Sequence, residues 1–372
     1  MTPNLHTGVI MQSCPHCNGV KLRNVKVRRS KRQFQCLSCA KYFSVPLEAS
    51  APTPDGYLIK GQSKLYDADG KVKLTWEKTD RNKEQQFEMM KQAITELAKS
   101  ITPIDEIPEP VYEPSDYANV VPIGDPHVGM YSAFNEVGEQ YTLKKAKALF
   151  TKAMTKAMDK CQPCDNCYII NVGDFFHSDL SSNRTARSGN ALDVDGRWNE
   201  IVKVGVHIVK TWVILALKKH KYVHIVNAIG NHDDHSSQWL NIAIDALFSS
   251  NKRVIVHDNA SQFQYFTFGK NLFGVTHGDT AKMADLGGIM ATDVPDMWGN
   301  SSHRYWYTGH VHHDQVKEFR GYKAESFRTL AGKDAWHHSS GYRSDRDIKV
   351  IVLHKEYGEV ERFTFNIEQF NE

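Results

Sequence analysis

The sequence predicts a layered α/β catalytic domain, preceded by a small zinc ribbon and a hairpin-plus-helix connector. Two observations lead to this prediction. Apolar strand-like runs alternate with amphipathic stretches from about residue 117 onward, a pattern typical of layered α/β domains. Two close pairs of cysteines stand upstream, at a spacing typical of a structural zinc site. We therefore expect three regions: a ribbon (1–47), a connector (48–116) and a catalytic domain (117–372).

The charge is distributed unevenly. The chain has 46 Lys and Arg against 43 Asp and Glu, but residues 1–47 contain eight basic residues and no acidic one. A basic module on an acidic body favours a polyanionic partner. No apolar run is long enough to cross a bilayer, and no signal peptide is evident at the start. We expect a cytoplasmic protein without a membrane partner.

The two cysteine pairs predict a four-thiolate zinc site. The ligands are Cys14 and Cys17 in the first pair, and Cys36 and Cys39 in the second. Each pair offers two thiolates from one tight turn, and the two pairs together complete a tetrahedron. The segment between them alternates apolar and basic residues, as a short hairpin does. Its core is too small to fold alone, so we expect one structural Zn²⁺ to stabilise it.

This ribbon resembles the zinc ribbons at the start of some transposases and phage DNA-acting proteins. The resemblance lies in the Cys-Pro-x-Cys pair and in the Cys-x-x-Cys-x-x-x-Phe ending at Phe43. It implies binding of nucleic acid, most simply DNA, by phosphate contacts from the tip of the hairpin. The candidates are Arg28, Arg29, Lys31 and Arg32. The alternative is a ribbon that binds a protein partner while its basic tip stays solvated.

The sequence of the connector predicts a linker, a hairpin and a helix. Residues 46–54 contain prolines and serine and are expected to link the domains. An Asp69-Gly70 turn lies between the apolar arms 64–66 and 72–76, which indicates a hairpin. Asp80 is expected to cap a helix that runs to about Ser100. Four prolines then make residues 101–115 a linker or an extended strap.

The sequence of residues 117–372 predicts strands that alternate with helices. Six segments are expected to form strands: 119–123, 167–172, 222–228, 253–257, 272–276 and 305–308. Three segments are expected to form helices: 143–160, 198–219 and 239–249. Residues 347–354 and 360–365 are expected to close the sheet.

Five short motifs follow strand-like runs and contain residues that bind metals. They are Gly124-Asp125-Pro126-His127, Gly173-Asp174-Phe175-Phe176-His177, Gly230-Asn231-His232-Asp233, His277-Gly278-Asp279 and Gly309-His310-Val311-His312. Ligands at the carboxyl ends of strands converge on one crevice in such folds. Glycines precede four of the ligands, where we expect sharp turns. Mixed His, Asp and Asn donors suit Mn²⁺, Fe or Zn²⁺ better than Ca²⁺.

These motifs, in this order, resemble the calcineurin-like metallophosphoesterase superfamily, whose fold is a layered βαβ sandwich. The resemblance implies two divalent metal ions in the active site, with Mn²⁺ expected first and Fe, Zn²⁺ or Mg²⁺ as alternatives. Asp125, His127 and His312 would bind the first ion, and Asn231, His277 and His310 the second. Asp174 would bridge both ions. A hydroxide activated between the ions would attack the phosphorus.

The same resemblance implies roles for three further residues. His232 would donate a proton to the leaving group or steady the transition state, with Asp233 orienting it. His177 would face the substrate phosphate. Taken singly, a histidine such as His277 is more often a satisfied polar residue than a ligand, but one reaction requires the whole ordered set. The remaining histidines are expected at the surface or behind the ligands, with His235 and His338 as the main exceptions.

Three cysteines at 161, 164 and 167 form a separate cluster. Such spacing can hold a metal, but no fourth ligand is evident. We favour reduced thiols in a loop that joins a helix to a strand.

The substrate is expected to be nucleic acid. The segment 178–198, with residues 331–337 and 341–343, resembles phage-encoded phosphoesterases described as DNA repair exonucleases, which implies a bacterial or phage-infected host cell. The expected substrate contacts are Arg184, Arg187, Arg197, Trp336 and Arg343. The leading hypothesis is a metal-dependent DNA nuclease. The alternatives are a phosphatase or phosphodiesterase acting on small nucleotides or phosphoprotein, and a non-enzymatic scaffold, which the complete ligand set disfavours.

Overall fold

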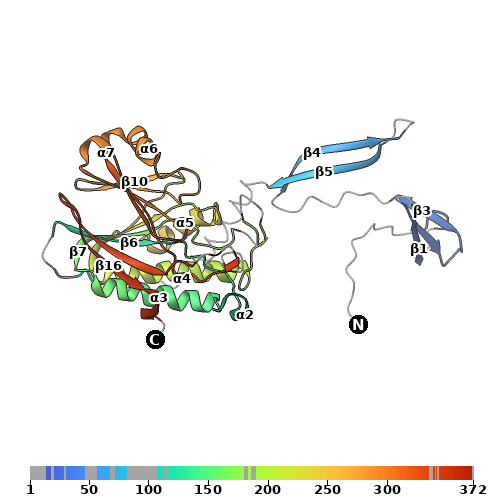
Figure 1. Ribbon diagram of the computed structural model, residues 1–372. Coiled ribbons are helices and arrows are strands. Elements are labelled where there is room, and N and C mark those ends of the chain that lie inside the picture. Colours follow the sequence, from blue (N-terminus) through green and yellow to red (C-terminus); the bar gives the residue numbers. More distant parts are fainter. Residues whose placement is uncertain are drawn as a thin grey trace. The chain divides into compact units, whose positions relative to one another are not determined.

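The computed structural model describes most of the chain: residues 14–17, 21–28, 31–46, 57–67, 72–81, 107–112, 115–179, 183–185, 190–334, 338–339, 341 and 343–370. The chain divides into two compact units, Met1–Gln86 and Phe87–Glu372 (Figure 1). The domain boundaries expected near residues 48 and 117 stay predictions.

The N-terminal unit contains two separate antiparallel sheets. Strands β1 (Leu22–Arg28), β2 (Lys31–Cys36) and β3 (Tyr42–Pro46) form the first, in the order β1-β2-β3. Strands β4 (Tyr57–Tyr66) and β5 (Val72–Arg81) form the second, which confirms the predicted hairpin and lengthens its arms. Asp80 pairs with Leu58 inside this ladder, so the prediction that it caps a helix is wrong. The rest of that helix lies outside the described residues.

A six-stranded sheet forms the middle of the C-terminal unit, with the strand order β16-β15-β6-β7-β8-β9. Its strands are β6 (Tyr117–Ile123), β7 (Cys164–Asn171), β8 (His220–Asn227), β9 (Val254–Val256), β15 (Asp347–His354) and β16 (Gly358–Asn366). Strands β6 to β9 are parallel, whereas β15 and β16 run antiparallel at one side. The parallel strands therefore end at the same edge of the sheet.

A second, five-stranded sheet packs on the first, with the order β10-β11-β12-β14-β13. Its strands are β10 (Gln264–Phe268), β11 (Asn271–Val275), β12 (His303–Thr308), β13 (Gln315–Phe319) and β14 (Tyr322–Ser326). Val120, Ile170 and Phe273 belong to one buried cluster between the two sheets. Each sheet thus buries one face against the other.

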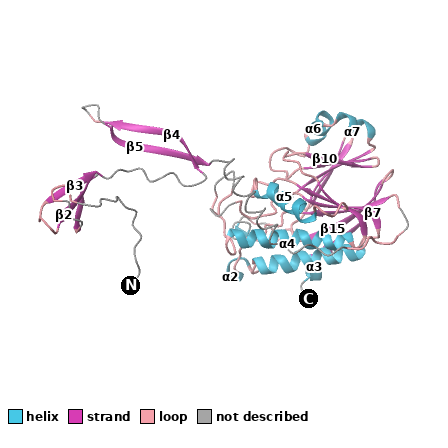
Figure 2. Ribbon diagram, turned by 180° about the vertical axis from the view of Figure 1, so that it is seen from behind, coloured by secondary structure: helices cyan, strands magenta, loops and turns pink. Residues whose placement is uncertain are grey.

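Helices cover the outer faces of the two sheets (Figures 1 and 2). Helices α3 (Leu143–Lys160), α4 (Trp198–Leu217) and α5 (Ser236–Phe248) lie on the first sheet, and the short α2 (Phe134–Val137) precedes them. Helices α6 (Leu286–Asp293) and α7 (Pro295–Asn300) pack on the second, and a short 3-10 helix (Ile367–Phe370) ends the described chain. The predicted layered α/β fold is confirmed.

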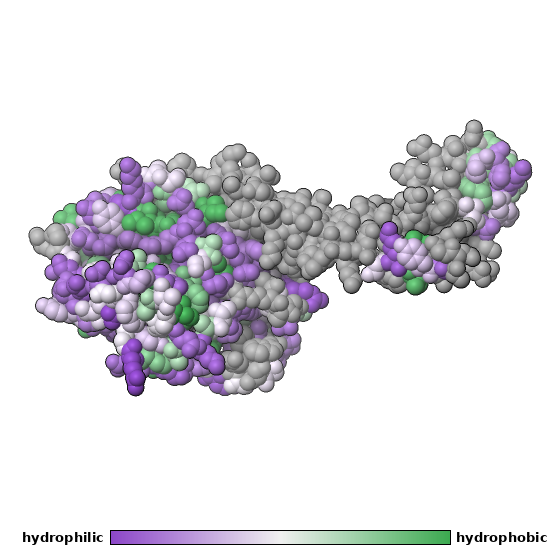
Figure 3. Space-filling view, turned by 90° about the horizontal axis from the view of Figure 1, so that it is seen from above, coloured by the Kyte–Doolittle hydropathy of each residue, from purple (hydrophilic) through white to green (hydrophobic). Residues whose placement is uncertain are grey.

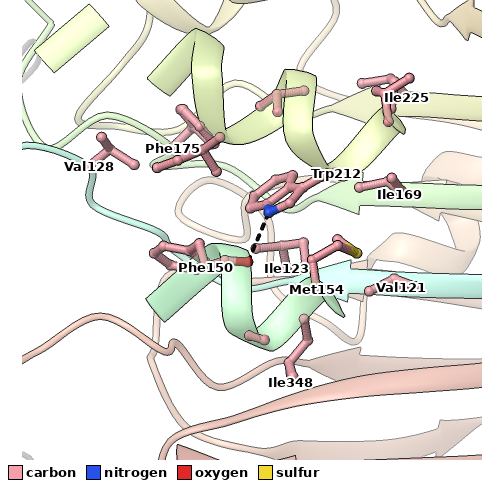
Figure 4. Packing of buried hydrophobic residues seen from close by; sticks show 14 of the residues in the cluster. Val121, Ile123, Val128, Phe150, Met154, Ile169, Phe175, Trp212, Ile225 and Ile348 are labelled. Carbon is pink, nitrogen blue, oxygen red and sulfur yellow. Dashed lines mark hydrogen bonds between the residues drawn. The ribbon is translucent and has the colours of Figure 1, made fainter. Parts of the chain in front are cut away.

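The core under α3 and α4 is dense and apolar. Trp212 of α4 lies between α3 and the sheet, and its Nε1 donates to the carbonyl of Phe150 at 3.1 Å (Figure 4). Phe175, from the second metal motif, meets the Trp212 ring edge-on at 6.0 Å. The motif loop is therefore fixed to the helical layer through aromatic packing.

The surface of the C-terminal unit is largely hydrophilic on the face seen in Figure 3. Along the described stretches, none of the helices has the length and apolar character needed to cross a membrane.

Candidate metal centre

The five motifs converge at one edge of the sandwich, because each follows the carboxyl end of a strand. Asp125 and His127 follow β6, Asp174 follows β7, and Asn231 follows β8. His277 follows β11 of the second sheet. His310 and His312 follow β12. The carboxyl ends of parallel strands form such a crevice, and the structure brings together all seven predicted active-site ligands.

Asp125, His127 and His312 form the first group, with donor atoms all within 4.8 Å of one another. His312 Nε2 lies 3.4 Å from Asp125 Oδ1 and 3.1 Å from His127 Nε2. Two donors on one ion, each about 2.1 Å from it, lie at most about 4.2 Å apart. These three side chains are buried and fit one cation.

Asp174, His277 and His310 form the second group, also within 4.8 Å. His277 Nε2 lies 3.1 Å from Asp174 Oδ2 and 3.0 Å from Asn231 Oδ1. A carboxylate, two imidazoles and a side-chain amide make the mixed donor set that borderline divalent ions prefer. This group fits a second cation.

The electrostatics of the centre favour added positive charge. Burial lowers the pKa of His277, but the Asp174 and Asp125 carboxylates outweigh it and raise the pKa to about 10. Burial raises the pKa of Asp174, yet His277 and His232 hold it well below its usual value. The pKa of His127 lies well below its usual value, because burial, His232 and His312 lower it more than Asp174 raises it. Buried carboxylates of this kind are stabilised by cations.

Backbone groups orient the ligands from behind. His277 Nδ1 donates to the carbonyl of Val172 at 3.0 Å, which leaves its Nε2 to face Asp174 and Asn231. The His310 N–H donates to Asp125 Oδ1 at 2.9 Å, and Thr329 Oγ1 donates to the Asp125 carbonyl at 2.6 Å. Such partners fix the tautomer and direction of a ligand. Sequence reasoning missed Thr329, because no motif contains it.

Strained backbone accompanies the ligands. Five of them have φ between 40° and 70°: Asp125, His127, Asp174, His310 and His312. Such conformations cost about 1–3 kcal/mol each and occur where function requires them. The prediction that the preceding glycines make the turns is right only for Gly173, whose φ is 105°. After Gly124 and Gly309, Asp125 and His310 make the turns themselves, whereas neither Gly230 nor Asn231 has a positive φ.

Gly230 is required for a different reason, which is space. A Cβ at this position would lie 2.1 Å from Asp174 Oδ1. We predict that Gly230→Ala displaces Asp174, lowering metal affinity about 10–100-fold and stability by about 1–3 kcal/mol. Metal titration and denaturant unfolding measure these effects. Gly288→Ala is the control, because its Cβ would meet nothing within 4 Å; unchanged metal affinity in both variants would contradict the prediction.

His232 stands beside the first group, but its partner differs from the one predicted. Its Nδ1 lies 2.9 Å from the carbonyl of His177, whereas Asp233 accepts from the N–H groups of Phe176 and Gly230. The prediction that Asp233 orients His232 is therefore wrong, because a backbone carbonyl holds His232 and both Asp233 oxygens accept from backbone N–H groups. Burial and the Asp174 charge raise the pKa of Asp233 well above its usual value.

His177 is buried, with 1% of its surface exposed, so it does not face the substrate as predicted. Its Nδ1 lies 3.3 Å from His127 Nδ1, and its ring stacks on His232 with centroids 5.3 Å apart. His127, His177 and His232 form a third group whose donor atoms lie within 4.8 Å. His177 therefore positions its two neighbours.

The predicted substrate contacts remain predictions. Arg184, Arg197 and Arg343 are exposed, and Arg343 donates to the carbonyl of His338 at 3.1 Å. Arg187 and Trp336 lie outside the described residues. His235 precedes α5, and its N–H donates to Asp179. A further cation that the sequence did not single out is Lys333, which lines a small hollow together with His312.

The three cysteines at 161, 164 and 167 are buried free thiols, as predicted. Cys164 and Cys167 lie in β7 rather than in a loop, and Cys161 caps α3. Burial raises the pKa of Cys161 to about 12 and that of Cys164 to about 11. Among the residues that the structure describes, this cluster is not one of the groups with metal-binding geometry.

The four ribbon cysteines do have metal-binding geometry. The Cys14–Cys39 Sγ atoms are 3.9 Å apart, and the Cys17–Cys36 Sγ atoms are 3.6 Å apart. Four thiolates about 2.3 Å from a central ion lie about 3.8 Å from one another in a tetrahedron. Desolvation opposes ionisation of Cys36, but the N–H groups of Cys39 and Ser38 lower its pKa to about 6. The group fits a tetrahedral metal.

No family model matches the chain, and no curated protein does. Solved structures with a similar fold include a predicted phosphoesterase from Streptococcus pneumoniae (10% identity, 67% of this chain and 98% of that chain, TM-score 0.27). A dimetal phosphatase from Danio rerio is another (9% identity, 68% and 100%, TM-score 0.37). Vacuolar protein sorting 29 from Cryptosporidium parvum is a third (13% identity, 67% and 98%, TM-score 0.31). At such low scores these likenesses carry no weight, and the site rests on its own geometry.

Proposed function

We propose that this protein is a metal-dependent phosphodiesterase that hydrolyses nucleic acid, with DNA as the expected substrate. One observation carries the proposal: two ligand groups lie side by side, with His277 Nε2 3.1 Å from Asp174 Oδ2 and His277 Nδ1 3.9 Å from Asp125 Oδ1 of the other group. Two adjacent divalent cations polarise a phosphoryl oxygen, activate water and neutralise charge on the leaving oxygen. The basic composition of residues 1–47 supports a polyanionic substrate.

The chain's own residues supply positioning and proton transfer. The Asp174 carboxylate belongs to the second group and also accepts from the His232 N–H at 2.8 Å. Because a carbonyl can only accept, His232 carries a hydrogen on Nδ1 toward His177, and its Nε2 is the atom left for the substrate. In its imidazolium form, His232 keeps the Nδ1 hydrogen on the His177 carbonyl and can give its Nε2 proton to a leaving oxygen, which leaves the neutral imidazole.

We predict that His232→Ala lowers the rate of DNA hydrolysis about 100–10,000-fold while metal content stays unchanged, because general acid catalysis contributes about that much. The assay uses Mn²⁺ and compares linear DNA, circular DNA, RNA and bis(p-nitrophenyl) phosphate. His235→Ala is the control, a histidine of the same loop between β8 and α5 that belongs to none of the three groups. Loss of metal together with activity would assign His232 to binding instead.

A small nucleotide is the second candidate substrate, and one feature favours it. A hollow of about 230 Å³ lies beside the second ligand group, lined by residues 278–283 and by Thr308, Gly309, Val311 and Gln315. Its size suits a single nucleoside rather than a duplex. Hydrolysis of nucleotides but of no polynucleotide in the same assay would replace the nuclease proposal with this one. Hydrolysis of phosphopeptides alone would reject both.

A further inference from the structure

The outer surface of α3 and α4 is strongly basic, although the unit that carries it is acidic. Residues 87–372 contain 31 Lys and Arg against 36 Asp and Glu. The two helices contain eight lysines and only two acidic residues, Asp159 and Glu200. The positive charge of this unit is therefore concentrated on one layer, and the remainder is more acidic than the total suggests.

The lysines form two rows, because residues four and seven apart share a helix face. The outer row is Lys145, Lys152 and Lys156 of α3, all exposed. The inner row is Lys147 of α3 with Lys203 and Lys210 of α4. His207 of α4 lies between Lys203 and Lys210 along the helix, and α3 packs against α4. Burial, then Lys147 and Lys210, lowers the pKa of His207.

Few carboxylates neutralise these rows. Within the described part of the chain, Lys145, Lys147, Lys156, Lys203 and Lys210 form no ion pair. A hollow of about 270 Å³ opens on the outer row, lined by Lys152, Lys156 and the hydroxyl residues Thr151 and Thr155, with Asp159 as the one carboxylate among its described residues. Ammonium and hydroxyl donors together are the groups that hold backbone phosphates.

The basic layer is joined to the metal centre through the start of its helices. The Leu143 N–H at the start of α3 donates to Asp195 Oδ2 at 2.6 Å, and the Asp195 N–H donates to the Gly129 carbonyl at 2.9 Å. Gly129 is two residues after His127, the last residue of the first metal motif. Figures 1 and 2 show α3 and α4 side by side along the sheet. The start of α3 is therefore linked, through Asp195, to the chain that follows the first metal motif.

We propose that the α3–α4 layer is a docking surface for the two phosphate backbones of duplex nucleic acid. Two separate rows of cations can each contact one backbone of a duplex, whereas a single strand needs only one row. The inference rests on the proposed function and deepens it, because it names double-stranded substrate.

The test compares three full-length triple variants in binding to a fluorescent DNA duplex over a range of salt. The first is Lys145→Gln/Lys152→Gln/Lys156→Gln, and the second is Lys147→Gln/Lys203→Gln/Lys210→Gln. Each should bind at least about tenfold more weakly at 0.1 M salt, with the salt slope reduced by about 2.7, because each lost phosphate contact lowers it by about 0.9. The charge-matched control, Lys252→Gln/Lys317→Gln/Arg320→Gln, changes exposed residues elsewhere and should bind as the parent does.

Three results would overturn the inference: unchanged duplex binding in either row variant, an equal loss in the control, or stronger binding to phosphatidylserine vesicles than to duplex. Hydrolysis of bis(p-nitrophenyl) phosphate with Mn²⁺ is measured in parallel, since a small diester does not need the surface. If the parent chain cannot hydrolyse it, the proposed function fails, and the duplex titrations still decide the docking surface separately.

Discussion

Replacement of Asp174 by asparagine is expected to lower kcat/KM for phosphodiester hydrolysis about a thousandfold or more, because a site built for two cations supplies several kcal/mol of charge stabilisation. Asparagine keeps the shape and can still accept from the His232 N–H, but it removes the charge that acts on His277 and His127. Both ligand groups are expected to weaken. Metal analysis of the purified variant should find fewer than two active-site ions.

Asp179→Asn separates this effect from simple destabilisation. Asp179 is also buried, five residues further on, but its Oδ1 accepts from the N–H groups of His235 and Ser236 and from Ser236 Oγ. Loss of its charge-assisted bonds is expected to lower the free energy of unfolding by about 1–3 kcal/mol with metal content retained. An Asp174→Asn variant that keeps full metal content and activity would refute the assignment of the centre.

The elements that the sequence predicted best are those with strong local signals. Helix α3 has the predicted bounds, because Thr142 caps its start by accepting from the Lys145 N–H at 3.2 Å and its apolar spacing is regular. The short α6 and α7 and the strands β10, β13 and β14 were not predicted. Strand β13 has the sequence QVKEF and lies at a sheet edge with mostly exposed side chains, so no buried pattern marks it.

Within the site, the sequence predicted which residues come together, but not how their side chains are oriented. A sequence motif shows which residues follow a strand, and the positions of the strand ends determine where those residues meet. It does not state which way adjacent side chains point, and the contacts of Asp233 with Phe176 and Gly230 depend on that. The carbonyls of Val172 and His177 that orient His277 and His232 carry no sequence signal, because every residue has one.

The ribbon is expected to depend on its metal far more than the catalytic unit does on any single ligand. Binding of Zn²⁺ by four thiolates contributes about 10–16 kcal/mol at pH 7 in small domains, more than three short strands can supply. We predict that Cys36→Ser, or EDTA treatment of the parent chain, unfolds residues 14–46. Metal analysis should find one Zn²⁺ fewer per chain, and hydrogen exchange should show that the ribbon amides lose their protection.

Cys167→Ser is the matched control for this prediction. Cys167 is also a buried free thiol, but burial raises its pKa well above the usual value, so it stays protonated and does not act as a thiolate ligand. Its replacement is expected to lower stability while the bound zinc stays at the parent's level. Cys36→Ser should in turn leave bis(p-nitrophenyl) phosphate hydrolysis intact, since the ribbon belongs to the other unit. Equal zinc in the parent and in Cys36→Ser would show that the four thiolates are not a metal site.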